Sequence, residues 1–279
     1  MKILILLLIL PFMVYGQEAR TNYLNYSARG TLEAHVGQEI GVNESYATLG
    51  ATVTKRQWEG GFFDFKWHRF EHGSNAASIG FGTNSDWSSQ EWIGFFYDWR
   101  HFRDQDFQQI GIQAEIDRCC WHLSFQGNLS LTNRKTICTF FEEFPGGFFF
   151  SKKSTEYACN LALLELSREF IIPSKWGDLS SRIGLGGYYI TNDIPERDFG
   201  FIGTFEMEWN DYWWVKAKYS HDPIFENRFQ ISIGIYFPIV EESSCCDCCC
   251  RNPILPRRTG IIPLRHKSCC RFNWDDSLR

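Results

Sequence analysis

Hydrophobic and polar residues alternate along most of the chain between residues 45 and 237, and this period of two predicts β-strands. The last such segment is the clearest, with Phe229, Ile231 and Ile233 on one face and Gln230 and Ser232 on the other. The predicted strands cover residues 46–54, 60–70, 75–83, 90–100, 107–116, 120–130, 136–142, 155–166, 180–191, 199–209, 211–220 and 227–237. The pattern therefore predicts twelve strands and an all-β fold.

The polar face of these strands is too polar for a dry protein core. The charged residues expected on it are Glu206, Glu208, Lys216 and Lys218, and each unpaired charge would cost several kcal/mol if buried without water. The strands approach the ~9–11 residues of a tilted membrane span, and Trp67, Trp99, Trp209 and Phe237 lie near strand ends, as in an aromatic girdle. We therefore expect an antiparallel transmembrane β-barrel with the polar face around the lumen. A soluble β-sandwich, with its apolar face inward, is the alternative fold.

An even number of strands places both ends of a barrel on the periplasmic side. The connections at Asn210-Asp211 and at His72-Gly73-Ser74 are then both expected in the periplasm. The segment from Glu143 to Ser154 is expected to face outward, and the longer connection from Ile171 to Gly177 to face inward.

Composition supports strands and argues against several other classes. The 279 residues are 44% hydrophobic, with a mean hydropathy of -0.29, which is too polar for a polytopic helical membrane protein. Aromatic residues make up 17% of the chain, an enrichment typical of strands and of membrane interfaces. The net charge of -5 gives no electrostatic reason to expect a nucleic-acid partner.

The ends of the chain differ from its middle. Residues 1–16 have a positive start and a short apolar run, which predicts a secretory signal peptide rather than the longer anchor that a helical span needs. Residues 17–44 are expected to be a periplasmic lead-in, residues 45–237 an outer-membrane barrel, and residues 238–279 a cysteine-rich tail.

Several segments resemble a known family. They are Ile93 to Arg100, Phe107 to Glu115, Phe65 to Gly82, Gly186 to Tyr189, Gly203 to Glu208, Asn210 to Tyr212, Lys218 to Ser220 and Phe229 to Gly234. Over residues 45–237 the chain looks like the β-domain of inverse autotransporters, the intimin/invasin-type outer-membrane barrels. The resemblance implies a twelve-stranded barrel that anchors, and helps export, a C-terminal passenger. This chain departs from the pattern, because the 41 residues from Ile239 to Arg279 are too few for an Ig-like domain of ~100 residues. Its tail is long enough to thread the lumen, or it stays in the periplasm.

Cysteines are concentrated in the tail. Of 11 cysteines, seven are Cys245, Cys246, Cys248, Cys249, Cys250, Cys269 and Cys270. In an oxidising compartment such a cluster favours disulfides, and adjacent cysteines join more readily to other partners than to each other. We expect cross-links to other envelope proteins. Metal binding by a set such as Cys246, Cys249 and Cys269, or a merely disordered tail, remains an alternative.

No enzyme motif is present in the sequence, and neither an enzymatic activity nor a cofactor is expected. The polar groups His101, Asp104 and Asp106 are expected on a periplasmic turn, and His221-Asp222 on an outward loop, as ordinary loop residues. The predicted function is an outer-membrane anchor that displays the tail, with outer-membrane lipid as its surroundings. A small solute pore is the alternative, in which the lumen charges set weak ion selectivity, and a barrel hydrolase is a more distant one.

Overall fold

The computed structural model describes residues 26–55, 61–84, 90–103, 105–118, 120–132, 134–144, 148–172, 179–191, 197–209, 212–240 and 260–274. The expected signal peptide and the cysteines of residues 245–250 lie outside these residues. Among the described residues, no helix is long and apolar enough to cross a bilayer.

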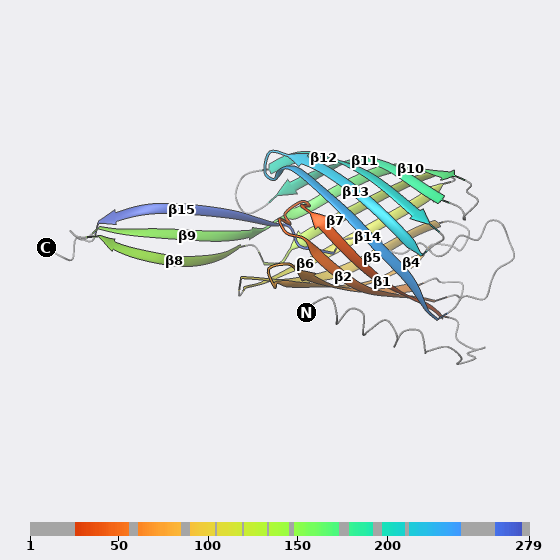
Figure 1. Ribbon diagram of the computed structural model, residues 1–279, viewed down its shortest axis with the longest axis horizontal. Helices are drawn as coiled ribbons and strands as arrows, with labels where there is room; N and C mark the ends of the chain where they lie inside the picture. Colours follow the sequence, from red (N-terminus) through yellow and green to blue (C-terminus); the bar gives the residue numbers. More distant parts are fainter. Residues whose placement is uncertain are drawn as a thin grey trace.

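Twelve antiparallel strands close into one barrel (Figure 1). In chain order they are β1 (Tyr26–Gly37), β2 (Tyr46–Lys55), β3 (Gly61–Phe70), β4 (Asn75–Asn84), β5 (Gln90–Phe102), β6 (Gln105–Arg118), β7 (Trp121–Ser130), β10 (Asn160–Ile172), β11 (Leu179–Thr191), β12 (Arg197–Trp209), β13 (Trp213–Asp222) and β14 (Glu226–Val240). The barrel closes where β1 pairs with β14. The predicted fold is confirmed.

Three further strands form a separate sheet that projects from one end of the barrel along its long axis (Figure 1). They are β8 (Arg134–Phe144), β9 (Phe148–Ala158) and β15 (Leu264–Trp274), with β9 in the centre. We call the end from which they project the sheet end. The opposite end, where β1 begins and β14 ends, is the base.

Three of the expected assignments are wrong. Residues 26–37, expected in the lead-in, form the first barrel strand, because Thr31, Glu33 and His35 alternate with Leu32 and Ala34. The outward residues of this strand are small or aliphatic, so its pattern is weak. The expected barrel strand 136–142 belongs instead to the projecting sheet, and the expected strand 155–166 covers the end of β9 and the start of β10. The prediction omitted β1 and counted 136–142 as a barrel strand, so the predicted number of barrel strands is still twelve.

The missed strand also changes which loops share an end. The turn at His72 to Ser74 lies at the sheet end, whereas the connection between β12 and β13 lies at the base. The two were expected on the same side. His101 and His221, expected on opposite sides, both lie at the sheet end.

The apolar face of the strands points outward. Large apolar side chains remain exposed over the outer wall, with Phe199 78% and Leu185 71% exposed. The alternating polar side chains point inward and are buried, among them Asp64, Glu115 and Gln109. This arrangement excludes the alternative of two stacked sheets with an apolar interior.

Five aromatic side chains of the barrel lie over a glycine directly opposite on the neighbouring strand. The pairs are Phe237 and Gly30, Phe62 and Gly82, Phe96 and Gly80, Tyr188 and Gly200, and Trp214 and Gly234. In each pair, a Cβ built on the glycine would come within 2.1–2.4 Å of the ring. Glycine therefore makes room for a large ring to lie flat against the wall.

Candidate functional site: the barrel lumen and its plug

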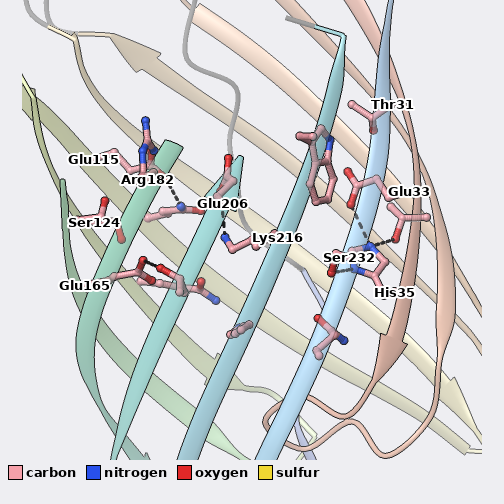
Figure 2. Close-up of a pocket in the computed structure, with 18 of the residues that line it drawn as sticks. Thr31, Glu33, His35, Glu115, Ser124, Glu165, Arg182, Glu206, Lys216 and Ser232 are labelled. Carbon is pink, nitrogen blue, oxygen red and sulfur yellow. Dashed lines mark hydrogen bonds and ion pairs between the residues drawn. The ribbon is translucent and has the colours of Figure 1, made fainter. Parts of the chain in front are cut away.

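The inward face of the strands encloses a polar cavity of about 130 Å³ (Figure 2). Its lining includes Glu33 and His35 of β1, Glu206 of β12, Lys216 of β13 and Ser232 of β14. These residues reach one space because alternate residues of every strand face the same side of the sheet.

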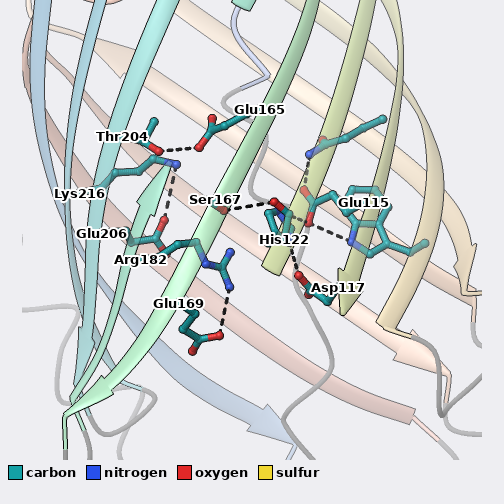
Figure 3. A network of polar contacts seen from close by, with 12 residues as sticks. Glu115, Asp117, His122, Glu165, Ser167, Glu169, Arg182, Thr204, Glu206 and Lys216 are labelled. Carbon is teal, nitrogen blue, oxygen red and sulfur yellow. Dashed lines mark hydrogen bonds and ion pairs between the residues drawn. The ribbon is translucent and has the colours of Figure 1, made fainter. Parts of the chain in front are cut away.

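Charges in the lumen are arranged in pairs (Figure 3). Glu206 and Lys216 are directly opposite on β12 and β13, and the Lys216 Nζ lies 3.6 Å from Glu206 Oε2. An Arg182 Nη2 lies 3.9 Å from Glu169 Oε2. Of the other expected lumen charges, Lys218 also lines the cavity and Glu208 is half-buried opposite Trp214. In a lumen with little water, the attraction within each pair offsets part of the energy cost of burying its two charges.

Histidines are tied into hydrogen-bonded chains in the same wall. The His35 Nδ1 is 2.7 Å from Ser232 Oγ, and its Nε2 is 3.0 Å from Glu33 Oε2 and 3.2 Å from Thr48 Oγ1. The same Thr48 Oγ1 lies 2.8 Å from His68 Nδ1. On the opposite wall, His122 contacts Asp117 through Nδ1, and its Nε2 is 3.5 Å from Glu115. In the part of the chain that is described, no three ligand-type side chains cluster so as to hold a metal ion.

A short piece of the tail occupies the lumen near the sheet end. Residues 260–264 are all buried there. Gly260 lies against Ser78 of β4, close enough that a Cβ on this glycine would come within 2.7 Å of the serine Cβ. Farther along, Ile261 packs with Val42, Tyr46 and Phe70, whereas Ile262 and Leu264 pack with Phe107 and Ala158. We call residues 260–264 the plug.

Arg100 of β5 holds the plug. Its side chain is 2% exposed, and its Nη1 donates hydrogen bonds to the carbonyl oxygens of Ile262 at 2.7 Å and of Gly41 at 3.3 Å. The guanidinium carbon also lies 4.9 Å from the centre of the Phe70 ring. Hydrogen bonds from a charged donor are stronger than neutral ones, and more so in a buried site. One buried cation therefore joins the barrel wall, an inward loop and the tail.

The loop between β1 and β2 folds into the barrel beside the plug. Its residues Ile40 and Val42 are buried, and the Gly41 carbonyl accepts a 3.1 Å hydrogen bond from the Leu264 amide. Gly41 has a φ of +68°, and a Cβ there would come within 2.5 Å of Pro263. Glycine is required at this position both by its backbone conformation and by the close approach of the tail.

Glu39 fixes this loop to β13 and β2. Its carboxylate accepts hydrogen bonds from Lys218 Nζ and, at 3.1 Å, from the Tyr46 hydroxyl. Burial alone raises the pKa of Glu39, but the charge and hydrogen bond of Lys218 outweigh it, so that the pKa falls below its usual 4.5. The carboxylate is therefore ionised and bonded at neutral pH.

The tail cysteines are only partly described. Cys269 and Cys270 lie in β15, where Cys269 pairs with Lys153 and Cys270 with Lys152 of β9. Outside the tail, Cys120 is exposed, whereas Cys159 is buried and its Sγ lies 3.9 Å from the Tyr157 carbonyl oxygen.

The polar loop residues named in the sequence analysis form two separate sets of contacts. His101 Nδ1 lies 3.0 Å from Asp106 Oδ1 on the surface, and Asp104 is outside the described residues. His221 is exposed and bonds Asn227, whereas Asp222 is buried and accepts hydrogen bonds from the Tyr188 hydroxyl and from two backbone amides. Neighbours in sequence thus point to opposite sides of the wall.

Sequence reasoning missed the plug and its arginine. Arg100 was already on the expected polar face of its strand, but a single cation on that face predicts no partner. The available signal was the apolar run Ile261-Ile262-Pro263-Leu264 in a basic and cysteine-rich tail.

The architecture and the polar lumen define the chain as a β-barrel of the outer-membrane type. The fold is similar to a membrane protein solved in work on in-meso crystallization, with a TM-score of 0.51 and 12% identity over 86% of this chain and 100% of that one. Solved structures with lower similarity include the KdgM porin, at 9% identity and a TM-score of 0.42 over 75% of this chain and 99% of that one. They also include the β-domain of the Bordetella autotransporter BrkA, at 11% identity and a TM-score of 0.32 over 76% of this chain and 97% of that one. No protein-family profile and no curated protein matches the sequence.

Proposed function

We propose that this protein is an outer-membrane anchor that carries its own C-terminal segment through the barrel and displays it at the sheet end. The observation that carries the proposal is the plug, whose Ile262 carbonyl is bound by Arg100 inside the lumen. The exposed apolar outer wall supports a membrane location, since such a surface suits lipid and not water.

The positions of two residues support passage through the lumen. Val240 pairs with Ala28 at the base, and Gly260 lies against Ser78 inside the barrel. From Gly260 the chain runs outward past Arg100 and enters β15 beyond the sheet end. The intervening residues 241–259 can span about 60 Å when extended, twice the ~30 Å hydrocarbon core of a bilayer.

The resemblance to inverse autotransporters supports the same arrangement, in which a barrel precedes the segment that it exports. Here the exported segment is one strand, β15, which completes a sheet with the β8–β9 hairpin. The sheet end is then the external side, and the base faces the periplasm.

A solute pore is the second candidate, and the polar cavity favours it. The two functions differ in what the plug does. In an anchor the plug closes the lumen permanently, whereas in a pore it must leave to admit solutes.

Two measurements test the proposal. On intact cells, an antibody against residues 264–279 should bind and added protease should remove that epitope; full protection from both would refute display. In planar bilayers, the full chain should conduct poorly, and deletion of residues 260–279 should raise its conductance. A full-length chain that already conducts like the deletion would favour the pore.

A further inference from the structure

Two arginines flank Trp121 on the outer wall of the barrel, near the base. Trp121 is the first residue of β7, and it pairs with Arg118 of β6 on one side and with Arg168 of β10 on the other. All three side chains are exposed. Because β7 begins at the base, this row is close to the rim of the wall, where the aromatic side chains of a membrane barrel meet the lipid headgroups.

The two arginines differ in their partners. The Arg118 Nη2 donates a hydrogen bond to a carboxylate oxygen of Glu91. Within the residues that the structure describes, the Arg168 guanidinium makes no hydrogen bond and no ion pair; its contacts are with two rings. Its central carbon lies 5.4 Å from the centre of the Trp121 ring and 5.3 Å from that of Phe170. The rings attract the cation but offer no oxygen to its N–H donors.

The surroundings of Arg168 are apolar. Its neighbours on the outward face of β10 are Leu166 and Phe170, which are 48% and 42% exposed, and on β11 it pairs with Ile183, which is 51% exposed. An arginine among lipid-facing apolar side chains is destabilising unless it reaches the headgroups or an acceptor. The described chain supplies no acceptor, so the acceptor has to come from water or from a lipid headgroup.

The two rings favour the headgroup. They hold the guanidinium from two sides, which restricts its motion and keeps it against the wall. A guanidinium binds a phosphate through two parallel N–H···O bonds along its edge, and rings that lie over its face leave that edge available. Because no described carboxylate bonds Arg168, the site has a net positive charge and suits an anionic headgroup better than a zwitterionic one.

We propose that Arg168, Trp121 and Phe170 form a binding site for the phosphate group of an anionic glycerophospholipid, whose acyl chains lie against the apolar wall. Arg168 binds the phosphate oxygens, and the two rings orient the guanidinium. The site requires only that the barrel is in a membrane. Its assignment to the periplasmic leaflet rests on the proposed function, in which the base faces the periplasm.

Native mass spectrometry of the full-length protein, freed of lipid in detergent, tests the site. With added phosphatidylglycerol, the wild type should retain one lipid per chain, and it should retain phosphatidylethanolamine more weakly. R168A should weaken the binding of phosphatidylglycerol by about fivefold in Kd. The control R118A removes an exposed arginine that already has a carboxylate partner, and it should bind like the wild type. Equal losses in R168A and R118A, or no preference for phosphatidylglycerol, would overturn the proposal.

A lysine variant separates the charge from the geometry. R168K keeps a cation but loses the planar fork, so its Kd should lie between those of the wild type and R168A. Wild-type affinity in R168K would refute the two-bond contact with phosphate. The folded band on gels without boiling shows that each variant has formed its barrel before binding is compared.

Soluble glycerol phosphate distinguishes a lipid from a free phosphate compound. It should not displace phosphatidylglycerol from the wild type, because it lacks the acyl chains that contact the wall. Displacement at equal concentration would show that the site takes soluble phosphates and would overturn the lipid assignment. These samples need no membrane orientation, so the lipid can bind even if surface display fails, and display can hold if R168A binds lipid normally.

Discussion

Arg100 donates a hydrogen bond to the carbonyl of Ile262, which lies 162 residues later in the chain. This bond joins the fifth strand of the barrel to the segment that leaves it. The same Nη1 bonds Gly41, so three distant parts of the sequence meet at one cation. The plug and the inward loop meet at this arginine, near the sheet end of the lumen.

Replacing Arg100 with alanine should loosen the plug. The change leaves the carbonyls of Ile262 and Gly41 without this donor, and each unsatisfied buried group costs roughly 1–3 kcal/mol. We expect single-channel conductance to rise and protease to cut more readily between residues 260 and 264. Arg118→Ala is the matched control, because Arg118 is exposed on the outer wall opposite Trp121. Unchanged conductance in Arg100→Ala would mean that packing alone holds the plug.

Acidification should weaken the inward loop through Glu39. Its folded pKa lies below the ordinary 4.5, so its stabilising effect is full above that ordinary value and is lost as the pH falls through the lower folded value. The melting temperature of the folded barrel should therefore decline below about pH 4.5. It can be followed on gels as the temperature at which the folded band shifts to the position of the boiled protein. Glu39→Gln should lower stability by roughly 1–3 kcal/mol at pH 7 and reduce the acid-dependent decline. If the melting temperature of Glu39→Gln falls with pH as steeply as that of the wild type, ionisation of Glu39 does not cause the acid-dependent loss of stability.

Adding one methyl group at Gly234 should destabilise the barrel. The new Cβ would come within 2.4 Å of the Trp214 ring, which must then move away from the wall. Overpacking of this kind costs typically ~1–3 kcal/mol, measurable by urea unfolding in detergent. At the control position, Gly203→Ala, the nearest atom would be 3.8 Å away. Equal stability of the two variants would show that Trp214 adapts without penalty.

A proline in β9 should release β15 without opening the barrel. Ser151 is the fourth residue of β9 and pairs with Arg271 of β15 and Phe141 of β8, and a proline there removes a ladder amide. We expect faster proteolysis of residues 264–274 in Ser151→Pro and an unchanged heat-modifiable barrel band. Ser151→Thr, which keeps the amide, should behave like the wild type. Equal cleavage in both variants would mean that another contact, for example the plug, keeps β15 in position.

Much of the barrel could be predicted because each strand carries its own signal. The alternation from Phe229 to Phe237 identifies β14, and the exposure of Phe229, Ile231 and Ile233 agrees with the expected outward face. Strand β1 was missed because its outward positions hold Leu32, Ala34 and Val36, which produce little contrast with their neighbours.

Pairing between distant segments could not be predicted in this way. The residues of β8 alternate no differently from a barrel strand, and only the tail strand beside β9 shows that they lie outside the wall. The same holds within the candidate site. The opposite charges of Glu206 and Lys216 follow from adjacent strands, whereas the contact of Lys218 with Glu39 requires a loop folded into the lumen.

The central place of β9 in the projecting sheet determines an order of events. Its partner β15 is the last strand of the described chain to be synthesised, whereas β8 and β9 are made after seven of the twelve barrel strands and before the other five. The β8–β9 hairpin therefore lacks its third strand until the five remaining barrel strands and Leu264–Trp274 have been made. A complete three-stranded sheet therefore shows that every strand of the barrel has already been delivered.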